Sequence, residues 1–231
     1  MSMSSLSKVN LATFMRDRRE QEASLKQPGP FLTISREYGC SGYFLGLLLV
    51  DLLSGEHTSR QPWKVYHREI LHYLANETNI AEEILDRVRR ERPTLLNDIF
   101  RSFSPANEPP GFQIRNRVDN IVRGLAYEGN AIIIGMGADG ATSEIPNGLR
   151  IRLVGPVEWR TVKVAESQGV DLQEARQIIL KRDREWEEMR KAFSCRFPRH
   201  PSFDIVYDCE SFALSQIAQD IVQAMRLRKM I

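Results

Sequence analysis

Five short apolar segments alternate with helical segments along this chain, and no other feature restricts its fold as strongly. The segments are 31–34, 63–66, 131–134, 150–154 and 203–207. Each has the length and the flanking turn residues typical of a buried strand. Strands that alternate with helices form right-handed βαβ units, so the pattern predicts an α/β fold. We expect three α/β/α layers around a five-stranded parallel sheet.

The chain divides into an N-terminal arm, residues 1–28, and one domain, residues 29–231. The arm ends at the chain breaker Gln27-Pro28-Gly29-Pro30 and is either a helix over 6–25 or a frayed tail. The stretch between the second and third strands is too long for one crossover, which predicts a helical insertion over 68–128. A capping-box-like start at Asp171 predicts a long helix to about Phe193.

Composition excludes several classes of protein. The chain of 231 residues has 32 basic and 30 acidic side chains, a net charge of +2, which gives no general attraction to nucleic acid. Its three cysteines, Cys40, Cys195 and Cys209, form no C-x-x-C pair, which argues against a disulfide framework or a zinc site. No apolar run approaches the length of a membrane span. We expect a soluble, reduced, cytoplasmic protein without nucleic-acid or membrane partners.

The first strand, loop and helix are the best candidate for a binding site. Loops after parallel strands lie at the carboxyl edge of the sheet, and the amides of a helix N-terminus attract anions. Gly39 and Gly42 would let phosphate oxygens approach the backbone. A standard P-loop has lysine where this chain has Gly42. The pattern alone therefore fits either a phosphate-binding loop or a plain glycine turn.

Several motifs together resemble the cytidylate kinase-like family. They are Thr33-Ile-Ser-Arg-Glu-Tyr-Gly39, Tyr66-His-Arg-Glu-Ile-Leu71, Gly129-Asn-Ala-Ile-Ile-Ile-Gly135, Pro156-Val-Glu-Trp-Arg160 and Arg182-Asp-Arg-Glu185. The resemblance extends from about Phe31 to the C-terminus. It implies a P-loop nucleoside-monophosphate kinase fold, with a helical monophosphate-binding insertion and a lid at residues 171–199. It also implies phosphoryl transfer from ATP, with Mg²⁺, to a nucleoside monophosphate, CMP by resemblance.

The resemblance assigns roles to individual residues. The donor phosphates would be bound by Ser35, Arg36, Gly39, Cys40, Ser41 and Gly42. Arg182 and Arg184 of the lid would be catalytic, because cations there would stabilise charge on the transferred group. Arg36 has a surface charge as its alternative role, and Arg182 an ion pair with Glu185 or Asp183.

The acceptor site is less well defined by sequence. Its candidates are Arg68, Arg115, Asp119, Arg123, Gly135 and Gly137. The arginines of segment 113–128 equally fit a solvated charged face. Arg160 is a further candidate for a phosphate or base contact, beside a core Trp159. Glu37, Asp139 and Asp183 are candidate magnesium ligands, and the sequence does not choose among them.

Three departures from the family pattern affect the functional expectation. Relatives usually continue the loop as Gly-Gly-Arg, where this chain has Ser41-Gly42-Tyr43. A family aspartate is His67 here, and a family Gly-Arg-Gly is Gly135-Met136-Gly137. Two cations and one carboxylate are thereby lost. The alternative to a kinase is therefore a catalytically impaired nucleotide-binding sensor or scaffold of the same fold. The sequence leaves the oligomeric state open, with a homodimer through the arm as one arrangement.

Overall fold

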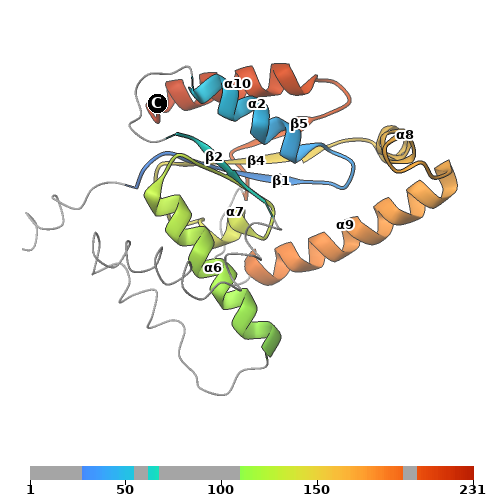
Figure 1. The fold of residues 1–231 in the computed structure, drawn as a ribbon, viewed down its shortest axis with the longest axis horizontal. Coiled ribbons are helices and arrows are strands. Elements are labelled where there is room, and N and C mark those ends of the chain that lie inside the picture. The colour runs from blue at the N-terminus through green and yellow to red at the C-terminus, as the bar shows by residue number, and fades with distance from the viewer. Residues whose placement is uncertain (1–27, 55–61, 68–109, 195–201) are drawn as a thin grey trace, which may run out of the picture.

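A five-stranded parallel sheet forms the centre of the computed structural model, which describes residues 28–54, 62–67, 110–194 and 202–231 (Figure 1). The strands are β1 (Phe31–Arg36), β2 (Lys64–Tyr66), β3 (Ala131–Ile134), β4 (Gly148–Val154) and β5 (Ile205–Asp208). Their order in the sheet is β2-β3-β1-β4-β5, and all four neighbouring pairs are parallel. The predicted α/β fold and its five parallel strands are confirmed.

Six helices are described around this sheet. They are α2 (Gly42–Ser54), α6 (Pro110–Glu128), α7 (Ala138–Ala141), α8 (Val157–Gln168), α9 (Leu172–Ser194) and α10 (Leu214–Leu227). The arm and most of the predicted insertion, residues 68–109, lie outside the described residues, as does the lid segment after Ser194. No helix in the described ranges is long and apolar enough to cross a bilayer.

The two faces of the sheet carry different helices because successive strand residues point in opposite directions. Leu32 and Ile34 of β1 belong to an apolar cluster formed with α2 and α10. Phe31 of the same strand belongs to a second cluster, formed with α6 and α7. Figure 1 shows α2 and α10 above the sheet and α6 and α7 below it. We call these the α2 face and the α6 face.

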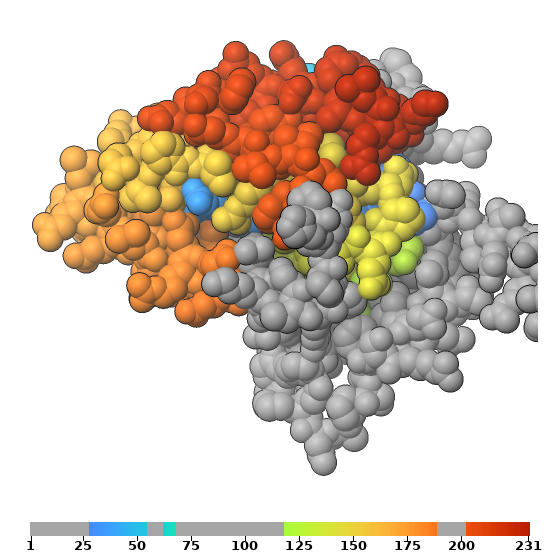
Figure 2. Space-filling view, turned by 180° about the vertical axis from the view of Figure 1, so that it is seen from behind, coloured from blue at the N-terminus to red at the C-terminus, as the bar shows by residue number. Residues whose placement is uncertain are grey.

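Helices α8 and α9 extend beyond the carboxyl ends of the strands. Gly169, in the left-handed conformation with φ 67°, ends α8 and lets α9 fold back against it. Val164 and Ala165 of α8 pack on Ala175 and Ile179 of α9, with Tyr38 at the border of this cluster. The space-filling view from behind shows α10 along the top of the molecule and α9 at its lower left (Figure 2). Contacts with Tyr38 show that α9 reaches the loop after β1.

Two local features differ from the sequence prediction. The four-residue helix α7 was not predicted, because it is too short to give a hydrophobic period; its last turn is closed by the Thr142 hydroxyl, which donates to Ala138 O at 2.7 Å. Ser211 has a side chain typical of helix N-caps but does not cap the last helix. The N-cap is Ala213, and the Ser211 hydroxyl donates to Asp208 Oδ2 at 2.8 Å instead.

Candidate functional site

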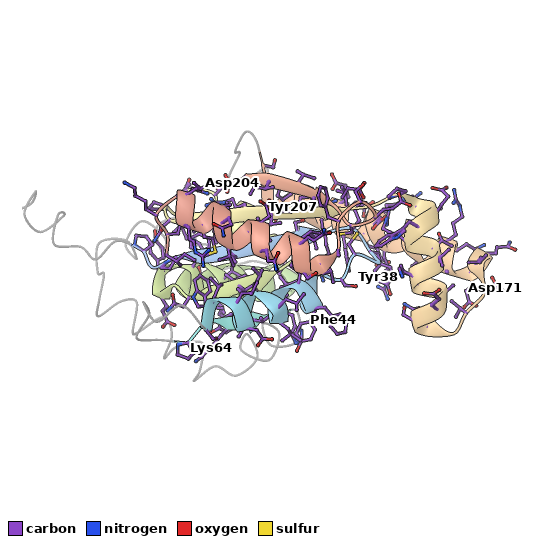
Figure 3. The ribbon with its side chains drawn as sticks, turned by 90° about the horizontal axis from the view of Figure 1, so that it is seen from above. Tyr38, Phe44, Lys64, Asp171, Asp204 and Tyr207 are labelled. Carbon is purple, nitrogen blue, oxygen red and sulfur yellow. The ribbon has the colours of Figure 1, made fainter. Side chains whose placement is uncertain are left out.

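The loop between β1 and α2 lies at the carboxyl edge of the sheet, where β1 meets α8 and α9. Figure 3 shows Tyr38 of this loop at the end of the sheet nearest those helices. Gly39 has φ 93°, and a Cβ atom there would lie 3.2 Å from Arg160 Cβ and from Val164 Cγ2. Glycine is therefore required at this position for two reasons, the backbone conformation and the closeness of α8.

The backbone amides of this loop fall into two groups. Glu37 N donates to Leu153 O at 3.0 Å, and Cys40 N and Gly42 N donate within the loop, at 3.1 and 2.8 Å. The predicted phosphate contacts of Cys40 and Gly42 are thus not available through their amides. Within the described chain, the amides of Gly39, Ser41, Tyr43 and Phe44 donate to no acceptor. They lie at or just before the first turn of α2, where unsatisfied amides make an anion site.

Arg160 of α8 holds the first half of the loop in place. Its guanidinium donates from Nε to Gly155 O at 2.8 Å, and from Nη1 to Tyr38 O at 3.0 Å and Asp183 Oδ2 at 2.6 Å. Its Nη2 lies 3.4 Å from Glu37 Oε2. The side chain is only 3% exposed. Its nitrogens therefore contact protein oxygens in this structure, at a place where the sequence had suggested a phosphate or base contact.

Asp183 of α9 completes this arrangement. Its Oδ1 accepts the Tyr38 amide at 2.8 Å, and its Oδ2 accepts Arg160. Glu37 Oε2 also accepts the Gly155 amide at 3.1 Å. The loop, the β4–α8 connection and α9 are thus joined by one buried cation and two carboxylates. We call Glu37, Arg160 and Asp183 the loop clamp. It has no local sequence signal, because its members are 23 to 146 residues apart.

Arg36 lies between the loop, α9 and the turn after β3. Its Cζ atom is 4.3 Å from the centroid of a Trp186 ring, and the Tyr38 ring is 5.5 Å from Trp186. A Cβ atom at Gly135, which has φ 71°, would collide with Arg36 Nη1. Arg36 is partly buried rather than a plain surface charge. Gly135 is needed so that this guanidinium can lie against the turn.

The two arginines of α9 that the resemblance made catalytic face solvent. Arg182 is 48% exposed, and its Nη1 lies 3.0 Å from Glu185 Oε2, which is the ion pair named as its alternative role. Arg184 is exposed and makes no hydrogen bond or ion pair within the described ranges. The residues that face the loop and α8 are Ala175, Ile179, Asp183 and Trp186. Asp183, not Arg182, therefore occupies the inward row of α9.

The acceptor candidates are placed in different surroundings. Arg123 is buried, and its Nη1 donates to Ala141 O at 2.6 Å, so it joins α6 to α7. Asp119 is fully buried on α6. Gly135 and Gly137 form the left-handed turn after β3, together with Met136. Arg68 and the side chain of Arg115 lie outside the described residues.

Other predicted residues near the loop have internal partners. The Ser35 hydroxyl accepts Arg152 Nη1 at 2.8 Å, a contact with no counterpart in the sequence prediction. Cys40 is a buried free thiol, and the neighbouring Cys209 thiol and burial raise the pKa of Cys40. Tyr43 packs edge-on against His67, with their ring centroids 5.1 Å apart. Two departures from the family pattern are thus in direct contact.

The described ranges contain no group of three or more His, Cys, Asp or Glu side chains that could hold a metal ion. Glu37 and Asp183, two of the candidate magnesium ligands, both contact Arg160. Asp139, the third, is buried in α7.

The sheet order, the unused amides of the loop after the first strand and the helix that returns to that loop match a P-loop nucleoside-monophosphate kinase-like fold. Residues 31–209 match the model of the cytidylate kinase-like family, and the chain belongs to this family. No curated protein sequence matches it.

Solved structures are similar to the chain at low identity. An uncharacterized protein from Eubacterium ventriosum ATCC 27560 is 21% identical, with a TM-score of 0.62 over 85% of this chain and 98% of that chain. A shikimate kinase from Acinetobacter baumannii, in complex with shikimate, is 12% identical, with a TM-score of 0.46 over 91% of this chain and 99% of that chain.

Proposed function

We propose that this chain binds ATP at the loop between β1 and α2 and transfers its terminal phosphoryl group to a nucleoside monophosphate, CMP by family resemblance. The observation that carries the proposal is the set of unused amides at Gly39, Ser41, Tyr43 and Phe44. They would bind donor phosphate oxygens, and the positive end of the α2 dipole would add to the attraction.

The side chains around the loop fit the remaining needs of phosphoryl transfer. That reaction depends mainly on positioning and on stabilisation of charge. The loop clamp fixes the loop backbone, which positions the amides before any ligand arrives. Arg36 stands beside the loop, and Arg182 and Arg184 project from the lid helix into solvent. In this proposal the lid arginines meet the donor phosphates when the nucleotide binds.

Magnesium would be the accompanying cofactor, since it neutralises charge between the donor phosphates during transfer. Mg²⁺ commonly keeps several water ligands and is held largely by substrate phosphates. Glu37 and Asp183 face Arg160, so this chain's carboxylates near the loop are used for positioning. The ion would therefore arrive with the nucleotide.

A nucleotide-binding sensor or scaffold is the second candidate, and the contact between Tyr43 and His67 favours it. These rings meet where the family pattern has a cation and a carboxylate. Loss of a positioned cation typically lowers turnover by orders of magnitude and affects binding less. Both candidates require ATP binding at the loop and differ only in turnover.

Two glycine variants test the binding site itself. Gly39→Ala forces a left-handed alanine against Arg160 and Val164, whereas Gly169→Ala adds a Cβ with nothing within 4 Å at a similar φ. Each substitution carries a backbone cost of about 1–2 kcal/mol. We expect Gly39→Ala to weaken ATP binding at least about tenfold in calorimetry, since loop positioning is lost. Gly169→Ala should bind ATP like the wild type.

A coupled assay with ATP, Mg²⁺ and CMP then separates the two candidates. Turnover supports the kinase, and ATP binding without turnover supports the sensor or scaffold. A Gly39→Ala variant with unchanged ATP affinity contradicts the proposed site.

A further inference from the structure

Arg152 is a partly buried cation beside the loop, and it has no assigned role. It lies on β4, in register with Ser35 of β1 and Val206 of β5. Its Nη1 donates to the Ser35 hydroxyl at 2.8 Å, and its Cζ lies 5.7 Å from the centroid of the Phe203 ring. A hydroxyl and an aromatic ring hold the guanidinium in place, but neither neutralises it.

The carboxylates nearest to Arg152 along the sheet are bound elsewhere. Asp204 Oδ2 accepts the Arg150 amide and lies near Arg228. Asp208 accepts the Glu210 amide and the Ser211 hydroxyl, and these hydrogen bonds, the first above all, lower the pKa of Asp208. Glu37 pairs with Arg160.

Within the described chain, no carboxylate therefore lies at ion-pair distance from Arg152. By contrast, Arg150 and Arg160, whose side chains are 4% and 3% exposed, each have an acidic partner. A partly buried arginine with spare donors and no acidic partner is suited to an external anion.

Arg152 also lies on the opposite side of the sheet edge from the donor site. Ile34 and Ile151, in register with each other, point to the α2 face. Their neighbours Ser35 and Arg152 point to the α6 face. The next residue in this row, Val206, is 56% exposed, so the row is open at its outer end. A phosphoryl group transferred from a donor bound at the N-terminus of α2 would move across the carboxyl edge of the sheet toward the α6 face.

We propose that Arg152, positioned by Ser35, binds the phosphate-monoester group of the acceptor; this inference rests on the proposed function. The guanidinium has five N–H donors, and one of them is used by Ser35. Its free edge matches the oxygens of a phosphate group in a two-point contact. Ser35 thereby acts by orienting Arg152, instead of contacting the donor phosphates.

Calorimetric titration of Arg152→Gln tests this assignment. Titrants are CMP, UMP, AMP and GMP, and ATP in parallel. The matched control is Arg176→Gln, which removes an exposed arginine paired with Glu158 on the outer surface. We expect Arg152→Gln to weaken monophosphate binding roughly tenfold to a hundredfold, the value of a charge-assisted hydrogen bond. ATP affinity should stay within about twofold, and Arg176→Gln should match the wild type for both ligands.

Two further variants exclude a merely structural effect. Arg152→Lys keeps the charge without the planar fork and should lose less monophosphate affinity than Arg152→Gln. Ser35→Ala should weaken monophosphate binding only a few-fold. Melting curves confirm that each variant is folded.

The outcomes separate this inference from the proposed function. If the wild type binds a monophosphate and Arg152→Gln binds it equally well, the inference alone is overturned. The same holds if Arg152→Gln weakens ATP binding instead. A wild type that binds ATP but none of the four monophosphates overturns this inference and also the proposed transfer to a monophosphate, and leaves the sensor or scaffold as the function. A wild type that binds neither ATP nor any monophosphate overturns both.

Discussion

Removing Asp183 from the loop clamp should destabilise the fold and loosen the loop at the same time. The Asp183→Ala change deletes two hydrogen bonds, from the Tyr38 amide at 2.8 Å and from Arg160 Nη1 at 2.6 Å. It leaves Arg160, which is 3% exposed, with Glu37 at 3.4 Å as its remaining acidic partner among the described residues. The substitution therefore removes a partly exposed carboxylate from a buried guanidinium.

The magnitude follows from that geometry. A hydrogen bond to a charged group contributes about 1.5–3 kcal/mol, and breaking a buried ion pair costs about 3–5 kcal/mol. The Asp183 side chain is 26% exposed, so water screens part of the interaction, and Glu37 retains part of the pairing. We expect Asp183→Ala to lower the free energy of unfolding by about 2–4 kcal/mol. At roughly 2–4 °C per kcal/mol, the melting temperature should fall by about 4–16 °C.

The assay combines stability with a local signal. Denaturant unfolding followed by circular dichroism gives the free energy, and Trp186, which contacts Arg36 and Tyr38, reports on the loop by fluorescence. The matched control is Glu185→Ala, two residues along the same helix, which breaks an exposed ion pair with Arg182. That change should cost no more than about 0.5 kcal/mol.

A double-mutant cycle with Arg160→Ala isolates the pair. The coupling free energy should be at least about 1.5 kcal/mol, since the residues share a short, largely buried contact. The reasoning is refuted if coupling is below about 0.5 kcal/mol, or if Asp183→Ala is no more harmful than Glu185→Ala.

Three further predictions concern other parts of the site and core. Arg182→Ala and Arg184→Ala should each change the melting temperature by no more than about 2 °C because both side chains are exposed. Each should weaken ATP binding about tenfold. If calorimetry shows unchanged ATP affinity for both variants, neither arginine belongs to the donor site. Gly135→Ala should displace Arg36 from Trp186 and change Trp fluorescence, whereas Gly169→Ala should not; identical spectra would contradict it. Burial, then the hydrogen bond with Asp220 at 2.6 Å, raise the pKa of Tyr207, so the folded state keeps this proton above about pH 10, where the unfolded state loses it. The free energy of unfolding should therefore decline above about pH 10. Tyr207→Phe should flatten that decline and lower the free energy of unfolding by about 1 kcal/mol at pH 7. Urea titrations at several pH values test this, and an alkaline decline as steep in the variant as in the wild type would refute the prediction.

Local signals explain why the sequence predicted the sheet well. Buried strands of a parallel sheet are continuous apolar runs, and the run Ala131–Ile134 appears in the structure with the same bounds. Gly169 ends α8 in the left-handed conformation, which glycine adopts readily after a helix. In each case, the deciding interaction lies within a few residues of the pattern.

The loop clamp could not be predicted in the same way. Asp183 and Tyr38 are 145 residues apart, and nothing local distinguishes Asp183 from its charged neighbours. A helix of 3.6 residues per turn places 175, 179, 183 and 186 in one row, and Arg182, which the resemblance made catalytic, lies one residue away from that row. The contact of Arg123 had no local signal either, because its partner, Ala141 O, belongs to a four-residue helix that the sequence did not predict.

The contact between Tyr43 and His67 changes how the missing family charges must be tested. If the two departures were independent, Tyr43→Arg alone would restore a cation to the loop. The rings are 5.1 Å apart, however, so an arginine at 43 would lose this packing and stand beside an imidazole instead of a carboxylate. We therefore expect Tyr43→Arg alone to lower stability without raising turnover. Tyr43→Arg combined with His67→Asp should recover the lost stability, because an opposite-charge pair replaces the aromatic one. Melting temperature and coupled turnover of both variants decide the matter. A single variant as active as the double variant would show that the two positions act separately, and that the missing cation alone limits this chain.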